Sequence, residues 1–285
     1  DLVKQAAAAG IGFNIDAEEQ DRLDLSLDLI EAMLSDPDLK GWDGFGVVVQ
    51  AYGRRAAPVI ETLYDMAERL DRKIMVRLVK GAYWDSEIKR AQERGLDGYP
   101  VFTRKSATDV SYLACAGFVL RHTDCFYAQI ATHNAMTLAW VHELAHGSDY
   151  ELQRLHGMAG SLYAVLEDCM EQPPPVRVYA PVGSHDELLP YLVRRLLENG
   201  ANSSFINQLN DAGLELDQLV ESADVEAGED SAQLPGLTLR LLDGSGGVPQ
   251  EYHVTMDLDG DGKIDIYVAN DGTPNFLFKN ISWSD

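Results

Sequence analysis

The sequence is poor in cysteine, and it contains neither a long apolar run nor a C-x-x-C pair. Its three cysteines, Cys115, Cys125 and Cys169, are odd in number, which argues against a disulfide framework and a zinc site. We therefore expect reduced, buried thiols in a cytosolic protein. No apolar stretch reaches the roughly 18 residues that a membrane-spanning helix needs. The first residues also lack the basic and then apolar layout of a secretory signal.

Basic residues are scarce as well: 23 lysines and arginines face 46 aspartates and glutamates, for a formal net charge of −23. Residues 1–210 hold 30 acids and 20 bases, whereas residues 211–285 hold 16 acids and 3 bases. This shift predicts a domain boundary near Asn210. An acidic surface repels phosphate backbones, so we expect no nucleic-acid partner. Binding to anionic lipid is disfavoured overall, although a local basic patch is compatible with the composition.

Short β-type runs alternate with helical patterns along the first part of the chain. The candidate strands are residues 12–16, 46–50, 74–79, 126–130, 151–155, 176–179 and 203–206. Residues 17–34 and 57–70 place apolar side chains at helical spacing. Strands that alternate with helices indicate parallel βα units, and apolar runs without strict alternation fit strands buried on both faces.

The number of strands bears on the kind of fold. A closed (βα)8 barrel needs eight strands, each followed by a helix, and we find seven. The chain opens with a helical stretch, residues 2–9, that ends at Gly10, a suitable C-cap. We therefore expect an α/β fold, a TIM-like (βα)8 barrel that lacks its first strand at the N-terminal edge. The unpaired sheet edges would weaken folding or activity.

Polar side chains gather where the candidate strands end. They are Asp16, Gln50, Arg77, Lys80, His133, Asn134, His156 and Tyr179. In a parallel barrel the carboxyl ends of the strands meet at one mouth, which is where active sites lie. We therefore expect these side chains to converge on one site.

Most of these residues also have a simpler structural explanation. Asp16 could cap the helix that follows it. The histidines and Asn134 could be satisfied structural or turn residues. Arg77 is harder to explain in this way, because a guanidinium inside an apolar run needs an anionic or hydrogen-bonding partner.

Arg194 and Arg195 lie in an amphipathic stretch, residues 188–199. Arg195 flanks the apolar stripe and Arg194 points nearly the opposite way, so both would meet one ligand only if this helix covers the barrel mouth. There the two guanidiniums would clamp a carboxylate. On a surface helix they would simply be solvated, and the pattern alone leaves both alternatives open.

Seven blocks of sequence stand out between residues 77 and 205. They are RLVKGAYWD from Arg77, YPVFTRK from Tyr99, TDVSYLACA from Thr108, ATHNA from Ala131, LHGM from Leu155, RVYAPVG from Arg177 and YLVRRLLENGANSSF from Tyr191. In order and spacing they resemble the catalytic domain of bacterial PutA-type, bifunctional proline dehydrogenases, over about residues 1–209. The resemblance implies a distorted (βα)8 barrel that holds FAD. It also implies oxidation of L-proline to Δ1-pyrroline-5-carboxylate by hydride transfer to flavin N5, the first step of proline catabolism.

The resemblance also implies roles for individual residues. Arg194 and Arg195 would grip the proline carboxylate. The proline pocket would be lined by Asp16, Tyr83, Leu155 and Tyr179, with Leu78 packed nearby. The flavin would be held by Arg77, Gln50, Lys80, Trp84, Thr103, Lys105, Thr132 and His133, with Glu198 and Phe205 near its adenosine end.

The same resemblance extends to electron transfer and location. The electrons would pass to a quinone, which implies a cytoplasmic protein with peripheral contact at the inner membrane. The family's pocket lysine on the first barrel strand and its glutamate partner cannot be present if the chain starts at Asp1.

Beyond residue 209 the pattern changes. We predict an acidic linker over residues 210–236 and a β-rich segment over residues 237–285. In the latter, a D-x-D-x-D-G-x-x-D pattern and its glycine turn suit a hard cation such as Ca²⁺. Its members are Asp257, Asp259, Asp261 and Asp265. The run resembles calcium-binding repeats of the FG-GAP or VCBS type, and a solvated acidic turn is the simpler alternative.

Three hypotheses about function follow. The chain is a flavin-dependent proline dehydrogenase, a calcium-binding β-repeat or adhesion-type module fused to an inactive barrel fragment, or an inactive scaffold. A fusion would explain why two such unlike segments are neighbours. Flavin absorption after purification would favour the first hypothesis, and a Ca²⁺-dependent shift in melting temperature would favour the second.

Overall fold

The computed structural model describes residues 1–170 and 172–184, five further positions up to residue 193, and the backbone of five short strands between residues 233 and 278. The chain forms two compact units. The first comprises Asp1–Thr103 and Thr108–Tyr179, and the second comprises Arg104–Ala107 and Ala180–Asp285. Apart from Lys105, the FAD- and proline-site residues that the structure describes lie in the first unit.

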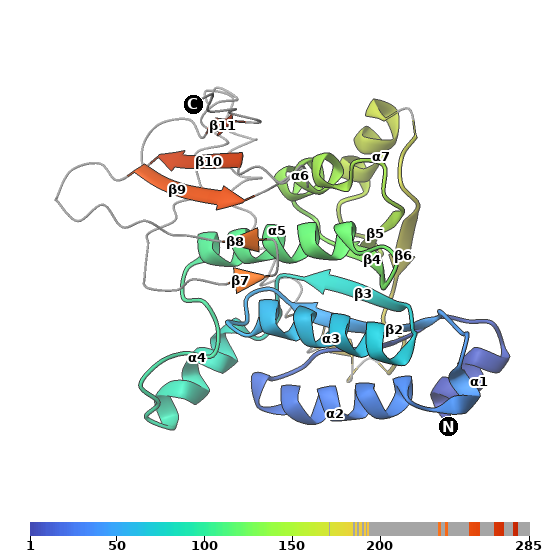
Figure 1. Cartoon of the computed structure of the whole chain (residues 1–285). Coiled ribbons are helices and arrows are strands. Elements are labelled where there is room, and N and C mark those ends of the chain that lie inside the picture. Colours follow the sequence, from blue (N-terminus) through green and yellow to red (C-terminus); the bar gives the residue numbers. More distant parts are fainter. Residues whose placement is uncertain are drawn as a thin grey trace. The chain divides into compact units, whose positions relative to one another are not determined.

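The first unit is built on a sheet of six parallel strands in sequence order (Figure 1). The strands are β1 (Phe13–Ile15), β2 (Phe45–Gln50), β3 (Ile74–Val79), β4 (Phe126–Ala131), β5 (Tyr150–Leu155) and β6 (Val176–Tyr179). Six of the predicted strands are thus confirmed to within a residue at each end. The seventh, residues 203–206, lies outside the described residues.

Alternation along β3 separates the two faces of the sheet. Ile74, Val76 and Leu78 are at most 1% exposed, whereas Met75, Arg77 and Val79 are only half-buried. The hydroxyl of Tyr112, on a helix, donates to the Leu78 backbone carbonyl. The buried set and Arg77 therefore lie on opposite faces of the sheet.

Two contacts between distant strands show that the inner face is concave. Asn14 of β1 donates a hydrogen bond to Gln129 of β4 at 2.7 Å. The Arg77 guanidinium of β3 stacks over the Tyr179 ring of β6. Strands three places apart would lie about 14 Å apart in a flat sheet, which is too far for such contacts. The six strands therefore form a curled half-barrel, consistent with a TIM-like barrel.

Helices connect the strands. They are α1 (Leu2–Ala8), the 3₁₀ helix η1 (Gln20–Arg22), α2 (Leu23–Leu34), the 3₁₀ helix η2 (Pro37–Leu39), α3 (Ala56–Leu70), α4 (Trp84–Glu93), α5 (Lys105–Arg121), α6 (Ala135–Ala145) and α7 (Gly160–Cys169). α2 packs against α3, and α3 packs against β2 (Figure 1). The core of this layer includes Ile60 and Leu63, both 0% exposed.

The two helices predicted from amphipathic patterns are both present. α3 begins one residue before the expected start and ends where expected. α2 begins at Leu23, six residues later than the predicted start at residue 17, because residues 16–19 form an irregular loop followed by η1. The predicted first helix ends at Ala8, and Gly10 follows in the left-handed region with a φ of 66° that suits glycine.

All three cysteines are free, as expected, but only two are buried. Burial raises the pKa of the Cys115 thiol to about 12, so this thiol stays protonated. The prediction of a buried thiol is wrong for Cys169, which ends α7 and is exposed. Within the described residues, no helix is both long and apolar enough to cross a membrane.

The described part of the second unit includes five short strands. They are β7 (Gln233–Leu234), β8 (Leu237–Thr238), β9 (Glu251–Met256), β10 (Asp265–Asn270) and β11 (Phe276–Phe278). β7 pairs with β8, and β10 lies between β9 and β11, all antiparallel.

Candidate active site

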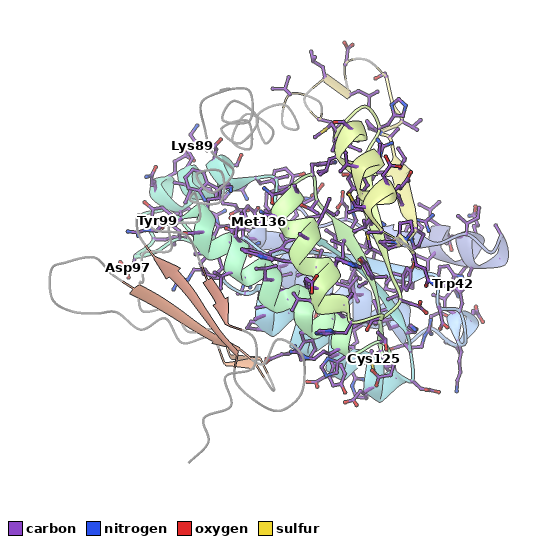
Figure 2. The ribbon with its side chains drawn as sticks, turned by 90° about the horizontal axis from the view of Figure 1, so that it is seen from above. Trp42, Lys89, Asp97, Tyr99, Cys125 and Met136 are labelled. Carbon is purple, nitrogen blue, oxygen red and sulfur yellow. The ribbon has the colours of Figure 1, made fainter. Side chains whose placement is uncertain are left out.

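The segments that follow the strands all leave the sheet at the same end. In Figure 2, Trp42 and Cys125, which precede β2 and β4, lie toward the right, whereas Lys89 and Tyr99, which follow β3, lie at the left. This is the end at which a parallel barrel carries its active site. Most of the polar residues singled out in the sequence lie at this end.

Arg77 and Tyr179 form the centre of the candidate site. The guanidinium carbon of Arg77 lies 4.5 Å from the centroid of the Tyr179 ring. Its Nε atom is buried and has no hydrogen-bond partner among the described residues. A buried N–H group without an acceptor is costly, so this atom fits a bound acceptor such as the edge of a flavin ring.

The segment after β4 places Thr132 and His133 beside the end of β5. The His133 Nε2 atom accepts a hydrogen bond from the Leu155 backbone N–H at 3.1 Å, so a neutral His133 carries its proton on Nδ1. Thr132 is 7% exposed and accepts from the Asn134 backbone N–H. Asn134 itself caps α6 through Thr137, so the structural alternative is confirmed for Asn134.

Lys80 follows β3 and forms an ion pair with Asp109 of α5. Gly81 comes next, with a φ of 134°, and a Cβ atom there would lie 2.5 Å from the Tyr52 ring. Only glycine fits this close approach. The turn leads to Tyr83, the N-cap of α4, and to Trp84, whose indole N–H donates to the Phe102 carbonyl at 2.8 Å.

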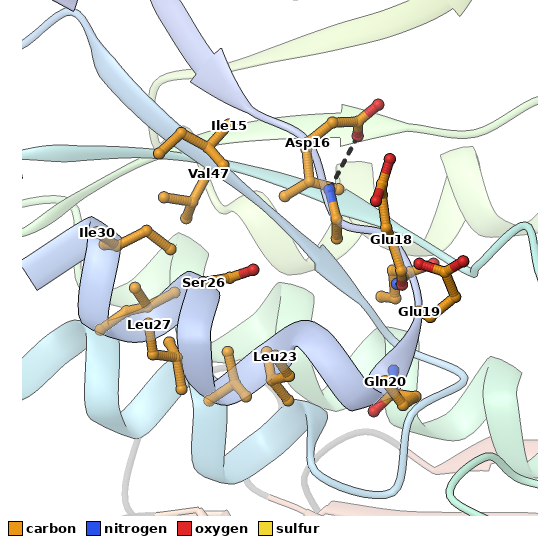
Figure 3. Close-up of a pocket in the computed structure, with 15 residues that line it drawn as sticks. Ile15, Asp16, Glu18, Glu19, Gln20, Leu23, Ser26, Leu27, Ile30 and Val47 are labelled. Carbon is orange, nitrogen blue, oxygen red and sulfur yellow. Dashed lines mark hydrogen bonds between the residues drawn. The ribbon is translucent and has the colours of Figure 1, made fainter.

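Asp16 lies in the loop after β1, at the rim of a pocket (Figure 3). Its carboxylate accepts from the Ala17 backbone N–H at 3.2 Å and caps neither η1 nor α2, so the helix-cap alternative is wrong. Gln50 also lines this pocket, and its amide donates to the Glu18 carbonyl at 2.7 Å. One amide hydrogen of Gln50 therefore remains for a ligand.

Sequence reasoning missed a polar layer on the inner face, centred on Glu151 of β5. This carboxylate is 2% exposed and accepts from Gln129 at 2.9 Å and from Gln153 at 2.7 Å. Arg177 of β6 binds it through two nitrogens at 2.8 and 2.7 Å. Burial alone would raise the pKa of Glu151, but Arg177 and the two amides lower it below its usual value. Alternate polar residues in the predicted strand 151–155 were the available signal.

The remaining predicted site residues lie in different parts of the chain. Leu78 is buried on the face of β3 opposite Arg77, and its expected place near the proline pocket stays a prediction. Thr103 and Lys105 are exposed, and Lys105 begins α5 within the second unit. Several predicted residues lie outside the described part of the chain: Arg194, Arg195, Glu198, Phe205, Asp257, Asp259 and Asp261. Asp265 begins β10, of which only the backbone is described.

The curled parallel sheet of the described residues is consistent with a TIM-like α/β barrel, in which the polar carboxyl-terminal end would carry the site. Comparison with known families matches the proline dehydrogenase family over residues 1–208. This chain therefore belongs to the proline dehydrogenase family.

Individual relatives agree with this assignment. The bifunctional protein PutA of Salmonella typhimurium is 52% identical over 264 residues, which cover 89% of this chain and 19% of the relative. The Escherichia coli protein is 55% identical over 237 residues, or 80% of this chain and 18% of the relative. A crystal structure of a Bradyrhizobium japonicum proline utilization A variant matches with a TM-score of 0.73 and 57% identity, over 78% of this chain and 23% of that chain. The chain thus spans about a fifth of the length of these three relatives.

Proposed function

We propose that this chain oxidises L-proline to Δ1-pyrroline-5-carboxylate with FAD, the first step of proline catabolism. Membership of the proline dehydrogenase family supports this proposal. The observation that carries it is the Arg77–Tyr179 pair at the barrel mouth, with the buried Arg77 Nε left for a bound acceptor. FAD would supply the acceptor for the hydride that proline loses at C5.

We propose that FAD would be held by a set of ten residues. They are Arg77, Gln50, Lys80, Trp84, Thr103, Lys105, Thr132, His133, Glu198 and Phe205. Arg77 and the spare amide hydrogen of Gln50 offer donors for the negative charge that a reduced flavin carries. Asp109 keeps the Lys80 ammonium compensated at the mouth.

The proline pocket would be formed by Asp16, Tyr83, Leu155 and Tyr179, and Arg194 and Arg195 would bind the carboxylate. A carboxylate held by two guanidiniums has a fixed orientation, which places C5 of the ring for transfer. The Tyr179 ring stacks on the Arg77 guanidinium and would thereby link the proline pocket to the residues that hold the flavin. Positioning of the substrate, rather than a strong base, would then determine the rate.

We further propose that the electrons pass to a quinone and that the protein is cytoplasmic, with peripheral contact at the inner membrane. The family assignment supports an oxidoreductase. The four residues proposed for Ca²⁺ lie outside the part of the chain whose side chains the structure describes, so no observation favours this second function.

The test is turnover by the full chain. Purified protein with added FAD, L-proline and a dye acceptor should reduce the dye, and proline alone should bleach the flavin absorption. Arg195→Met should raise the KM for proline about tenfold or more, because a clamped carboxylate loses one of its two charge-assisted partners. Arg69→Met is the control, because Arg69 of α3 forms an exposed ion pair with Glu31 of α2, away from the candidate site. A wild-type chain that binds FAD but is not reduced by proline would refute the proposal.

A further inference from the structure

The loop that carries Asp16 is held by side chains from elsewhere in the fold. Residues 16–19 have no regular structure, so their backbone polar groups need other partners. Gln50, at the end of β2, donates to the Glu18 carbonyl at 2.7 Å. Arg55, at the start of α3, donates to the Gln20 carbonyl at 2.6 Å. Two elements thus fix the loop from the side of the sheet.

The third partner is Glu87 of α4. Its Oε1 atom accepts a hydrogen bond from the Gln20 backbone N–H at 2.7 Å. Glu87 is only 2% exposed and Gln20 only 6%, so water does not compete for this bond. A carboxylate is costly to bury unless it is hydrogen-bonded, and a backbone N–H group gives it a charge-assisted partner.

Glu87 also lies one helical turn after Tyr83 along α4. The Glu87 backbone N–H donates to the Tyr83 carbonyl at 2.9 Å, and Tyr83 is the N-cap of α4. The first turn of α4 therefore connects Tyr83 to Glu87, whose carboxylate binds the Gln20 backbone N–H. In Figure 3, Gln20 lies at the far end of the loop that begins at Asp16, where η1 begins, so the Glu87–Gln20 hydrogen bond holds that end of the loop on α4.

We infer that Glu87 is a positioning residue that fixes the Asp16 loop relative to Tyr83, the two sides of the proline pocket. This inference rests on the proposed function. It assigns Glu87 no contact with substrate: the carboxylate acts through the Gln20 amide and through the first turn of α4. Its loss should widen the pocket and weaken proline binding more than it slows the chemical step.

Ion pairs on the surface join the same two segments but cannot replace this bond. Arg94 binds Asp21 at 2.7 Å, and Arg90 lies 3.5 Å from the same carboxylate. All three side chains are at least one-third exposed, and exposed ion pairs contribute little. The buried Glu87–Gln20 bond is therefore the contact to test.

The test compares Glu87→Ala with Glu87→Gln in the full chain with FAD. Glutamine keeps an acceptor oxygen for the Gln20 N–H, and alanine does not. We expect Glu87→Ala to raise the KM for proline about tenfold with a smaller change in kcat, and Glu87→Gln to restore most of the affinity. Glu93→Ala is the matched control, because Glu93 lies on the same helix and is exposed. Its KM should equal that of the wild type.

A second measurement does not depend on turnover. Hydrogen exchange of the peptide covering residues 16–22 should be faster in Glu87→Ala than in wild type and in Glu93→Ala, because the Gln20 amide loses its acceptor. If Glu87→Ala does not fold, Glu87→Asp, which is shorter by one methylene, should show the same rise in KM.

The outcomes are distinguishable. A wild-type chain that is inactive toward proline refutes the proposed function. In that case hydrogen exchange still tests the hydrogen bond between Glu87 and the Gln20 backbone N–H. An active wild type whose Glu87→Ala variant keeps its KM refutes the inference. So does a variant in which flavin content and melting temperature fall while KM is unchanged, because that pattern is purely structural.

Discussion

At the scale of single residues, Arg77 is placed by an aromatic ring from a strand three places away. The Tyr179 side chain is half-buried, so the contact is partly desolvated and should contribute about 1 kcal/mol. We predict that Tyr179→Ala weakens FAD binding about fivefold, because the Arg77 guanidinium loses the ring that holds it. Tyr179→Phe retains the ring face and should bind FAD as the wild type does. Quenching of flavin fluorescence measures both constants, and equal losses in the two variants would contradict a role for the ring.

Glu151 is a buried charge on the inner face. Its partners determine how much stability is lost when it is replaced. The Arg177 side chain is 63% exposed, so it can turn to solvent when the carboxylate is removed. Gln129 and Gln153, in contrast, are buried and would keep only a neutral acceptor. The cost of Glu151→Gln should therefore be that of weakened hydrogen bonds, about 1–2 kcal/mol, rather than that of a stranded buried charge.

The lowered pKa of Glu151 gives this prediction a direction with pH. A carboxyl group whose pKa is lower in the folded state stabilises the fold above its unfolded pKa, near 4.5, and this contribution is lost as pH falls through the folded pKa. The destabilisation by Glu151→Gln should thus be full at neutral pH and shrink below about pH 4.5. Urea unfolding at several pH values measures it. Glu143→Gln, at an exposed site on α6, should show no difference at any pH.

At the scale of elements, α3 buries its inner side against the sheet. Leu63 is 0% exposed, whereas Leu29 on the outer side of α2 is 50% exposed. The same substitution should therefore lower the free energy of unfolding by very different amounts at the two sites. Leu63→Ala should cost about 2–5 kcal/mol and Leu29→Ala less than about 1 kcal/mol. Midpoints of urea unfolding compare the two. Similar losses would mean that α3 is not packed as described.

Strand and helix positions could be predicted where one local pattern dominates. The β-rich runs gave six strands, and the apolar spacing of residues 57–70 gave α3 almost to the residue. α5 offers no such stripe because its residues are buried nearly all round, among them Tyr112 and Phe118. The start of α2 could not be predicted, because the backbone of residues 18–20 bonds to side chains that are distant in sequence, Gln50 and Glu87.

The candidate site was predictable in its position but not in its partners. Parallel strands place Gln50, Arg77 and Tyr179 at one end whatever their neighbours are. Lys80 pairs with Asp109 of α5, and Glu151 is surrounded by a polar layer. Both arrangements depend on the curl of the sheet, which no local sequence pattern encodes. Roles for Arg194 and Arg195 stay predictions, since both lie outside the described residues.

At the scale of the whole molecule, charge is the dominant imbalance. The described residues form surface ion pairs such as Lys4–Asp36 and Arg69–Glu31, each worth little. Even if every one of the 23 bases were paired, half of the 46 acids would have no cationic partner. Repulsion among these carboxylates opposes the compact state more than the exposed pairs support it.

Added salt should therefore stabilise this chain. Screening weakens attraction and repulsion alike, but the net charge of −23 means that repulsion is the larger sum. We predict that raising NaCl from about 10 mM to about 300 mM increases the melting temperature by a few degrees, since the screening length falls from about 30 Å to below 10 Å. KCl at the same ionic strength should give the same shift, because screening does not depend on the identity of the monovalent ion. A melting temperature that falls with salt would mean that the ion pairs outweigh the excess charge.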